Sequence, residues 1–492
     1  GRASMEAAAA AVRRRAVSPA RTRTAEDPPP KPAGDEKPDA KHASAESLPA
    51  QASSFADVFA QVIGPLLLMV TTPIFCLVAA YATNEASATI SEVVADAFEH
   101  GVLELSKKIF FSTLPTLRAA VLLFVFNFLA LLVYHWPGVV KYGPLSENGA
   151  RPDYVDNGIA HCVLCTFMFI GGSELGLGWY RLDVLYEHFP GTIGCLNIFG
   201  LAFCLLLYVK GLRSPSGPDA GTSGHGFIFD YYWGTELYPR LFGVDVKKFV
   251  NCRFSMTYWQ LAGISFAAAS YYKHGRVDPG VLLCAISQYL YLVKFYIWEI
   301  GYMRSIDIII DRAGFYETWG CLVWVPSVYT LHTRAAVGIP SGLGWVGATF
   351  IFVIGLAGVG LNFWADHQRQ MFRESEGKMK VWGKKAEFIE ATYTAKNAET
   401  NKMETHKSLL LASGWWGLAR HLQYSFELTA AWSWGLLGGG THSLLPLFYP
   451  AFLTVLLVHR ASRDQEKCLA KYGDDYKKYM QLVPYKIIPY LY

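Results

Sequence analysis

Charged residues are scarce in this chain. Asp, Glu, Lys and Arg make up 17% of its 492 residues, whereas 52% are hydrophobic; an average soluble protein is about 25% charged. This composition excludes disorder over most of the length, a coiled coil and a collagen-like chain, and it indicates a protein surrounded largely by lipid. The 44 basic and 40 acidic residues nearly balance, so the net charge does not indicate a nucleic-acid partner.

Cysteine is also infrequent, with nine residues in the whole chain. Most of them lie in apolar runs, where a reduced thiol behaves as a small hydrophobic group, so we expect no disulfide framework. The chain lacks a Walker loop, an HExxH motif and a pair of CxxC motifs. Cys162 and Cys165 do have CxxC spacing, but their apolar surroundings favour a core position, and we predict no metal site.

The first 50 residues differ from the rest because they are rich in Ala, Pro, Arg and Ser and almost lack large apolar side chains. Such a segment cannot bury enough surface to offset its chain entropy. We therefore predict a disordered tail over residues 1–52 and a folded domain over residues 53–492. The tail has no apolar core of a secretory signal; a cytosolic tail is the preferred interpretation, and a transit peptide is the alternative.

Apolar runs of about 20 residues, the length of a membrane-spanning helix, recur from residue 55 onward. They do not alternate as the strands of a membrane barrel would, so the expected fold is all-α and polytopic, with about ten spans. An even number places both termini on one side. The ten runs lie near residues 57–82, 114–134, 157–178, 190–210, 253–272, 278–298, 313–331, 342–364, 409–435 and 443–459.

Two segments next to these runs are basic: residues 365–408 and the stretch that follows residue 459. Lys and Arg beside membrane spans mark the cytoplasmic side. We therefore expect both segments and both termini in the cytosol. The charges either serve topology alone or also contribute to a site, and composition leaves both interpretations open.

Residues 342–347 spell GxGxxG, the pattern of a dinucleotide-binding turn. That turn needs a preceding strand and a helix whose amino end faces a pyrophosphate. Here the pattern follows Pro340 and opens an apolar run, so we reject it as a nucleotide site. Small residues that let membrane helices approach closely are the better explanation.

Ionisable residues inside or beside membrane spans are costly and are functional by default. Three groups stand out: residues 230–240, Glu299 with Asp307 and Asp311, and Glu427. Individually each could be a buried ion pair that fixes helix packing. Taken together, with the aromatic residues around them, they favour a polar cavity.

The C-terminal block, residues 459–479, combines Arg, Lys and Tyr. These side chains suit phosphate groups and an adenine face, but Lys and Tyr at a membrane exit also serve as interfacial anchors. Composition alone leaves these two roles open.

Several blocks in a fixed order make the chain resemble the sterol reductase family of ergosterol-type biosynthesis, integral membrane enzymes that reduce sterol double bonds with NADPH. The resemblance extends from about residue 60 to Tyr492. The blocks are Glu236-Leu237-Tyr238-Pro239-Arg240, residues 311–316, Gly320-Cys321-Leu322-Val323-Trp324-Val325-Pro326, residues 413–421, Lys471-Tyr472-Gly473 and residues 483–489.

Within the family the chain is most similar to the Δ7 branch of plant type, which reduces the C7=C8 double bond of Δ5,7 sterols. The Δ14 branch usually has Asn where this chain has Tyr238, in the block of residues 234–240. One departure concerns Gln423, since many relatives have Asn there. Gln still donates and accepts hydrogen bonds, so the contact with the cofactor is altered rather than lost.

The resemblance implies an NADPH pocket formed mainly by residues 360–492 and a sterol cavity beside it. Arg369 and Arg373 would hold phosphates. The other cofactor residues implied by the family motifs are Leu411, Trp416, Gln423, Tyr424, Asp464, Cys468, Leu469, Ala470, Lys471, Tyr472 and Tyr479. The sterol would lie near Glu236, Glu299 and Tyr329, and its expected contacts are Glu236, Tyr238 and Trp324.

Reduction of an unactivated double bond needs an acid that protonates one carbon before hydride reaches the other. Protonation at C8 of a Δ5,7 diene leaves an allylic cation that extends to C7, so a conjugated diene suits this chemistry. The donor should be a Tyr or a carboxyl group whose neutral form is favoured by burial. The candidate catalytic residues are Tyr479, Glu299 and Tyr329.

Two alternatives remain at this level: a Δ14-sterol reductase with the same fold and cofactor, and a non-catalytic sterol-binding or transport protein. The inverted repeats of many transporters are not visible in the sequence. The expected location is the endoplasmic reticulum membrane. The expected partners are the sterol and membrane lipid, with other enzymes of sterol biosynthesis as further candidates.

Overall fold

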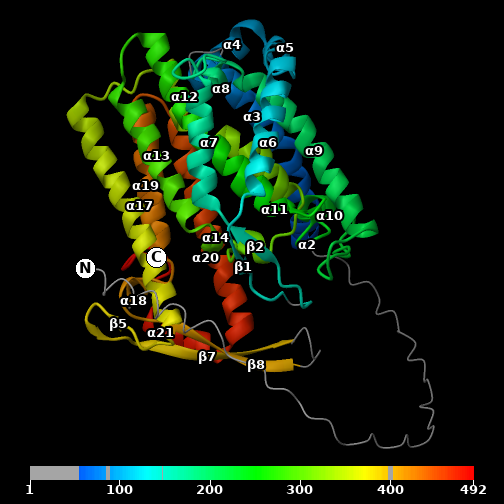
Figure 1. Cartoon of the computed structure of the whole chain (residues 1–492), viewed down its shortest axis with the longest axis vertical. Coiled ribbons are helices and arrows are strands. Elements are labelled where there is room, and N and C mark those ends of the chain that lie inside the picture. The colour runs from blue at the N-terminus through cyan, green and yellow to red at the C-terminus, as the bar shows by residue number, and fades with distance from the viewer. Residues whose placement is uncertain (1–54, 85–88, 147, 397–402) are drawn as a thin grey trace, which may run out of the picture. The chain divides into compact units, whose positions relative to one another are not determined.

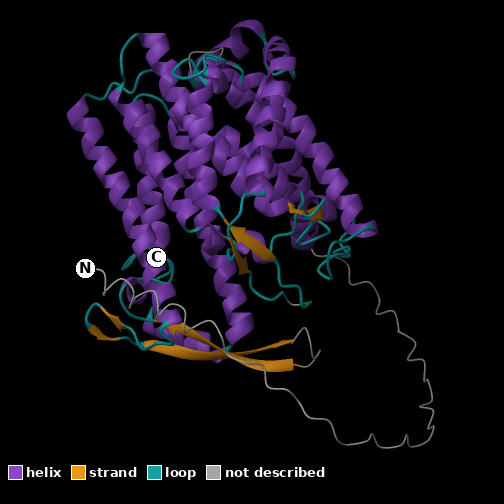
Figure 2. Cartoon of the chain, in the orientation of Figure 1, coloured by secondary structure: helices purple, strands orange, loops and turns teal. Residues whose placement is uncertain are grey.

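The computed structural model describes residues 55–84, 89–146, 148–396 and 403–492. The predicted tail, residues 1–52, lies outside the described residues. Residues 53–492 form one compact unit, and most of its elements are helices (Figure 2). The predicted all-α membrane fold is therefore confirmed, with a few short hairpins added to it.

Six helices of the described residues are long and apolar enough to cross a membrane. They account for six of the ten predicted runs. These helices are η1 (Phe59–Ile63) continued by α3 (Gly64–Asn84), α6 (Leu117–Tyr134), α9 (Phe189–Arg213), α13 (Pro279–Ile297), α17 (Trp345–Glu374), and η5 (Leu445–Leu447) continued by α20 (Phe448–Tyr472).

The other four runs form different structures, so a count of ten spans is not confirmed. Helix α7 (Gly158–Gly172) is apolar but has 15 residues. Helix α12 (Met256–His274), preceded by the π-helical η2 (Phe249–Ser255), is mostly buried inside the protein and carries polar side chains. The seventh run is a second π-helix, η3 (Phe315–Tyr329), followed by α16 (Leu331–Gly338).

The expectation of one helix over residues 409–435 is wrong. Its beginning is the end of strand β8 (Met403–Leu411), and Gly414 has a positive φ of 63° before the short helix α18 (Trp415–Leu418). Only α19 (Leu422–Gly435) and η4 (Leu436–Gly440) continue as helix. Apolar composition alone did not separate a buried strand end from a span.

The remaining helices are short or lie at the ends of the bundle. Helices α4 and α5 lie at the opposite end from α21 and the β7–β8 hairpin (Figure 1). Their bounds are α2 (Phe55–Val58), α4 (Ile90–His100), α5 (Val102–Ser112), α8 (Val184–Glu187), α10 (Phe227–Trp233), α11 (Val246–Lys248), α14 (Glu299–Tyr302), α15 (Ile306–Ile309) and α21 (Asp474–Leu482).

Four antiparallel hairpins complete the described structure. Three of them are short: β1 (Val139–Tyr142) with β2 (Asp153–Asp156), β3 (Arg240–Leu241) with β4 (Val244–Asp245), and β5 (Lys380–Val381) with β6 (Lys384–Lys385). The longest pairs β7 (Phe388–Lys396) with β8, in a register that places Phe388 opposite Leu411. Its inner side packs Ala391 and Leu410 against Tyr476 and Tyr479 of α21.

Helices α17 and α19 approach each other at two glycines. A Cβ added to Gly355 would lie 2.0 Å from Ser433 Oγ, and one added to Gly358 would lie 2.8 Å from the Phe426 carbonyl oxygen. The predicted close approach at the GxGxxG segment is wrong for Gly344 and Gly347, because no atom of another helix lies within 4 Å of an added Cβ there. Gly342 does make a close contact, since a Cβ added there would lie 2.5 Å from His442 Nε2. The glycines at the contact between α17 and α19 lie about two turns deeper than Gly347.

A fully buried ion pair joins η2 to α14. Both guanidinium ends of Arg253 donate to the carboxylate of Glu299, and Nη2 also donates to Asn157 Oδ1 at 2.6 Å. The ammonium of Lys248 lies 3.8 Å from Glu299 Oε2. Two cations therefore surround one carboxylate where water has no access, and the network ties three segments of the chain together.

Because this pair is buried, removing one partner leaves an uncompensated charge that costs about 3–5 kcal/mol. We expect Glu299→Gln to lower the thermal unfolding midpoint of the purified protein sharply. The double variant Arg253→Leu/Glu299→Leu should recover part of that loss, because it leaves one buried cation, Lys248, without the carboxylate instead of two.

Glu104→Gln is the matched control, since Glu104 forms an exposed pair with Lys107 at 2.7 Å that is worth about 1 kcal/mol or less. An unchanged midpoint in Glu299→Gln would contradict a structural role for this pair.

Candidate functional site

Most of the predicted cofactor residues lie together at the end of the bundle that carries the β7–β8 hairpin (Figure 1). Helix α17 supplies two arginines in its last turns, and α18 and the start of α19 supply aromatic and amide side chains. The end of α20 and helix α21 close the opposite side. Two hydrophobic clusters hold these elements in place, one around Phe372 and Trp416 and the other around Leu410 and Tyr479.

Arg369 and Arg373 form a basic pair on one side of α17. The Arg369 guanidinium lies 3.8 Å from the centre of the Trp416 ring and 3.0 Å from Asp366 Oδ1. Arg373 Nε donates to the Leu409 carbonyl at 3.4 Å, and its charge interacts with Arg369. Since two neighbouring guanidinium groups repel each other, this arrangement favours an anion with several negative charges.

The aromatic residues of α20 and α21 face the same basic pair. Tyr472 and Tyr479 interact electrostatically with Arg373, and Tyr472 Oη donates to Ser408 Oγ at 3.4 Å. Burial raises the pKa of Tyr479 to about 12, against the opposing charges of Arg369, Arg420 and Arg373. The Tyr479 phenol therefore stays protonated and can donate a hydrogen bond near the arginines.

His421 precedes α19 and lies deep in this region. Its ring stacks on Tyr424 with centroids 5.1 Å apart, and Nε2 is 3.5 Å from Asp464 Oδ2. Burial lowers the pKa of His421 to about 4, although Asp464 opposes the shift. Both ring nitrogens, and Oε1 of Gln423, are buried without a hydrogen-bond partner among the described residues. Unpaired polar atoms in a buried site are costly, so they favour a polar ligand here.

The remaining predicted cofactor residues follow along the last turns of α20. Cys468 Sγ lies 3.8 Å from Asp464 Oδ2, and the ammonium of Lys471 lies 3.8 Å above the Tyr393 ring. Leu469 packs in the same cluster as Tyr479, whereas Ala470 is exposed. Leu411 is buried against Trp416 at the end of β8. All the predicted cofactor residues therefore lie in or around one region.

Arg460 of α20 forms an ion pair with Asp307 and joins this region to the centre of the bundle. The Arg460 charge interacts with Tyr424 and Tyr316. The Tyr329 phenol interacts electrostatically with both Arg460 and Asp307. One turn further along α20, Arg463 Nη2 donates to Asp311 Oδ1 at 2.8 Å. These contacts anchor the segment between α14 and η3 to α20.

An apolar groove of about 480 Å³ runs between α3, η3 and α20. The hydroxyls of Thr71 and Thr72 donate back to carbonyl oxygens of their own helix at 2.8 Å, so they add little polarity. Trp324, a predicted substrate contact, lies in the groove, with its ring 5.7 Å from that of Phe75. The lining residues are Thr71, Thr72, Ile74, Phe75, Val78, Trp324 and Phe448.

Tyr329 lies in the aromatic cluster behind this groove. Its ring centroid is 4.8 Å from that of Tyr449 and 5.3 Å from that of Trp259, and Trp324 borders the same cluster. No hydrogen bond of the Tyr329 hydroxyl occurs among the described residues. The phenol thus lies between the groove and the Arg460–Asp307 pair.

The other predicted substrate and catalytic residues lie in separate networks. Glu236 accepts a hydrogen bond from Lys210 Nζ at 2.7 Å and from the Ser216 amide. Tyr238 packs in a cluster around Tyr154, with the Lys247 ammonium 5.7 Å from its ring. Glu299 is enclosed by the Arg253 ion pair described above. The structure does not bring these three residues together with Trp324 and Tyr329.

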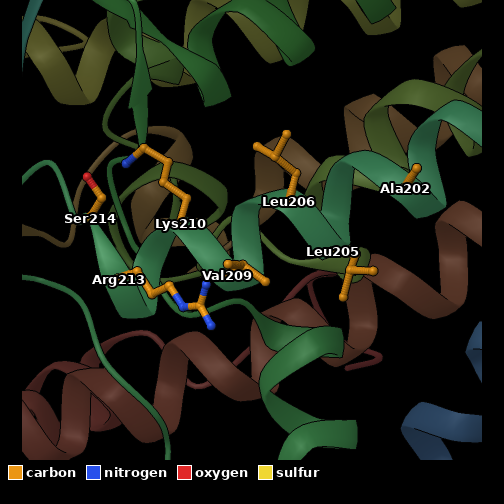
Figure 3. Close-up of a pocket in the computed structure, with 7 residues that line it drawn as sticks. All are labelled: Ala202, Leu205, Leu206, Val209, Lys210, Arg213 and Ser214. Atoms are coloured by element: carbon orange, nitrogen blue, oxygen red, sulfur yellow. The ribbon is translucent and has the colours of Figure 1, made fainter.

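A second apolar hollow lies over α9 and contains no predicted site residue (Figure 3). Ala202, Leu205, Leu206 and Val209 line its apolar part, and Lys210 and Arg213 lie toward the end of the helix. The Lys210 ammonium is engaged by Glu236. Because one helix face supplies all seven lining residues, this hollow is part of the lipid-facing surface.

Three residues of the site were not among the predicted site residues: His421, Arg460 and Asp307. His421 had no distinguishing sequence signal except its place next to Arg420. Arg460 did have a signal, because it lies in the C-terminal block of Arg, Lys and Tyr that suits phosphate groups, but that signal did not single it out. Asp307 was noted in the sequence as an ionisable residue beside a span, but only the fold identifies Arg460 as its partner.

A bundle of membrane helices with a basic, aromatic region at one end and an apolar groove between three of its helices defines a membrane protein that combines an anionic ligand with an apolar one. The chain belongs to the Ergosterol biosynthesis ERG4/ERG24 family, which matches residues 56–492. This confirms the resemblance seen in the sequence blocks. The chain is thus a sterol reductase, an oxidoreductase of the membrane.

Named relatives cover most of the chain. A 7-dehydrocholesterol reductase of Arabidopsis thaliana is 40% identical over 432 residues, 87% of this chain and 96% of that protein. A 7-dehydrocholesterol reductase of Danio rerio is 32% identical and covers 76% of this chain and 77% of its own length. A Delta(14)-sterol reductase of Methylotuvimicrobium alcaliphilum is 35% identical, and the match covers 72% of this chain and 79% of that protein.

The lowered pKa of His421 predicts a loss of stability in acid. The unfolded state takes up a proton near the ordinary histidine pKa of about 6.5, whereas the folded state resists protonation down to about pH 4. The contribution of neutral His421 to the free energy of unfolding is complete above pH 6.5 and is lost as the pH falls toward 4. It amounts to about 3 kcal/mol at most.

Unfolding midpoints of the wild type and His421→Gln at pH 8 and pH 5 test this expectation. The drop between the two pH values should be smaller in the variant, while the exposed His225→Gln should keep the wild-type drop. Equal drops in all three proteins would show that His421 does not titrate as the structure implies.

Proposed function

We propose that this chain is an NADPH-dependent 7-dehydrocholesterol reductase that reduces the C7=C8 double bond of Δ5,7 sterols. The main support for this proposal is the 40% identity to the Arabidopsis 7-dehydrocholesterol reductase over 96% of that protein. The geometry of the site supports it in two ways: a basic pair suited to a polyanion, and a groove suited to a flat apolar molecule.

NADPH fits the C-terminal region. Arg369 and Arg373 would hold phosphates, and Lys471, Tyr472 and Tyr479 would border them. Leu411, Trp416, Gln423 and Tyr424 would line the cofactor, and the unpaired polar atoms of His421 and Gln423 offer hydrogen bonds to its amide and hydroxyl groups. When bound, the cofactor supplies the hydride. Asp464 and residues 468–472 would complete the pocket.

The sterol would occupy the groove between α3, η3 and α20. Its volume of about 480 Å³ lies within the roughly 300–1,000 Å³ typical of small-molecule sites. Trp324, Phe75 and Phe448 offer apolar faces to the flat ring system. The groove borders α3 and α20, two of the membrane-spanning helices, so a sterol would reach it from the lipid.

Tyr329 is the proton donor that the geometry favours. It lies between the groove and the Arg460–Asp307 pair, and a proton passed to C8 would leave a cation at C7 for hydride. Glu299 is a weaker candidate because its carboxylate is enclosed by Arg253 and Lys248 and does not line the groove. Tyr479 is placed beside the arginines that would hold phosphates, so its phenol serves cofactor binding better than protonation of the sterol.

The proposed location is the endoplasmic reticulum membrane with both termini in the cytosol. Basic residues next to spans face the cytoplasm. The exposed Lys378, Lys380, Lys384, Lys385 and Lys407 lie at the end of the bundle that holds the cofactor residues. NADPH from the cytosol would then reach the pocket directly. Other sterol-biosynthesis enzymes in that membrane are the proposed neighbours.

The direct test incubates membranes containing the protein with 7-dehydrocholesterol and NADPH, followed by mass spectrometry of the sterols. We expect a product that has gained two hydrogens and lost the Δ7 bond, and a Δ14 sterol in parallel should react far more slowly. Reduction of the Δ14 sterol alone would show that the protein is a Δ14-sterol reductase instead. This second candidate function is supported by the 35% identity to a Delta(14)-sterol reductase.

The Δ7 preference offers a test of Tyr238, the residue at which the Δ14 branch usually has Asn. The structure packs Tyr238 against Tyr154, Met303 and Ile308 rather than in the groove. We therefore expect Tyr238→Asn to lower turnover of both sterols together, along with the unfolding midpoint. A selective loss of Δ7 turnover, with Δ14 turnover retained, would instead place this residue in the sterol site.

The basic pair predicts a preference for NADPH over NADH. Arg369→Ala and Arg373→Ala should each raise the KM for NADPH by roughly 10- to 100-fold, because a charge-assisted hydrogen bond contributes about 1.5–3 kcal/mol. The KM for NADH should change little if the lost partner is the 2′-phosphate.

Lys378→Ala is the control, since this exposed lysine pairs with Glu376 at 2.9 Å outside the pocket. Equal rates of the wild type with both cofactors would contradict the assignment of the arginines.

A further inference from the structure

Residues 378–385, called the basic hairpin below, form a turn at the end of α17 that the proposed reaction does not use. Its two short strands place Lys380 directly opposite Lys385, and Lys384 follows the turn. All three lysines are exposed. Like charges directly opposite in a hairpin are destabilising, so the fold maintains an unfavourable arrangement at its surface.

No ion pair of these three lysines occurs among the described residues. The nearest carboxylate on the preceding turn, Glu376, is engaged by Lys378 at 2.9 Å. Glu387, two residues beyond the hairpin, forms no ion pair with them either. The hairpin thus presents three positive charges that no carboxylate of the described residues compensates.

Trp382 lies at the tip of the hairpin in a strained conformation. Its φ is +49°, followed by Gly383 at +80°, whereas a bulky residue rarely adopts positive φ. The side chain is 53% exposed. Its ring packs against Trp415 at 5.2 Å, and Trp415 packs against Trp364 of α17 at 5.5 Å. Strain of this kind persists at sites where the surroundings require it.

The hairpin lies beside the lipid-facing side of α17. Val346 and Phe350 of that helix are 87% and 68% exposed, as expected for residues that face lipid. Trp364 is 18 residues beyond Val346, which is five full turns at 3.6 residues per turn, and it is 51% exposed on the same side. Through Trp415, the hairpin is held against this face at the lower end of α17 (Figure 1).

We propose that the basic hairpin binds anionic phospholipids of the membrane leaflet at this end of the bundle. Trp382 would lie among the headgroups, where tryptophan side chains concentrate. The lysines would contact the phosphate and carboxylate groups of a lipid such as phosphatidylserine. An anionic surface neutralises the repulsion between Lys380 and Lys385, and it explains why an exposed tryptophan occupies a turn position that suits glycine.

A topological role alone does not explain this arrangement. Lysines that only orient the chain need no fixed geometry, whereas these are held on a hairpin by Val381, which is buried against Phe372 and Trp416. Electrostatic attraction to an anionic leaflet contributes about 1 kcal/mol for each lysine near the surface, or roughly a fivefold preference, and salt screens it.

The test is lipid competition on the full-length protein. Wild-type protein in detergent is mixed with equal amounts of phosphatidylserine and phosphatidylcholine that have the same acyl chains, and retained lipids are counted by native mass spectrometry. We expect a preference for phosphatidylserine that weakens in high salt. The triple variant Lys380→Gln/Lys384→Gln/Lys385→Gln should reduce this preference at least fivefold.

The matched control removes three charges from exposed lysines that already pair with carboxylates: Lys407→Gln/Lys477→Gln/Lys478→Gln. It should keep the wild-type preference. No preference in the wild type, or equal losses in both triple variants, would overturn the proposal. Displacement of phosphatidylserine by soluble glycerophosphoserine would also overturn it, because the site would then bind free anions rather than lipid.

A second variant tests the tryptophan. Asn tolerates positive φ, so Trp382→Asn should keep the turn while removing the interfacial ring. We expect lower retention of both lipids, without a change in their ratio as large as that of the triple lysine variant. Unchanged retention of both lipids would remove Trp382 from the lipid site. None of these measurements depends on which sterol the enzyme reduces.

Discussion

Charges inside a bundle surrounded by lipid have to be neutralised by the protein itself, and this constraint organises the centre of the structure. Arg253 and Glu299 form one such pair, and Arg460 with Asp307 forms another. The second pair, with Arg463 and Asp311, attaches α20 to the segment between α14 and η3. Helix α20 contributes Phe448 at its start to the apolar groove and Asp464 nearer its end to the basic region. These ion pairs therefore fix in place one helix that serves both regions.

The contact between α17 and α19 has a comparable effect on the pocket. Gly355 and Gly358 let the two helices approach until no Cβ fits between them, and Asn362 donates to the Gln423 carbonyl oxygen at 2.9 Å. The start of α19 is thereby held against the last turns of α17. As a result, His421 and Tyr424 reach the same region as Arg369, although about 50 residues of chain separate them.

Hydropathy predicted well where a helix faces lipid and poorly where it is enclosed by protein. The six long apolar helices include runs such as 190–210 and 342–364. In contrast, α12 packs inside the bundle, where Thr257 and Gln260 pair with neighbouring side chains, and the run at 409–435 contains a buried strand end. An apolar run indicates only that its side chains are shielded from water. The side chains of a buried strand are shielded in the same way as those of a membrane span, so the two cannot be told apart by hydropathy.

Among the site residues, the sequence blocks predicted the C-terminal cofactor set as a group, and the structure places that group in one region. They did not separate Glu299 from Tyr329, because the partner that neutralises Glu299 is Arg253, 46 positions away. The orphaned ring nitrogens of His421 were likewise invisible, since an unpaired atom is defined by what surrounds it in space.

The sequence by itself determined the membrane character of the chain, its helical class and its family, because apolar runs and ordered motif blocks are local features. Tertiary structure decided which charged residues are neutralised and which remain available. It made Glu299 part of an ion pair, held Arg369 against Trp416 one turn from Arg373, and placed Trp324 in the lining of an apolar groove. The physical reason is that the free energy of a buried charge or ring depends on its neighbours in space, and folding brings those neighbours from distant parts of the chain.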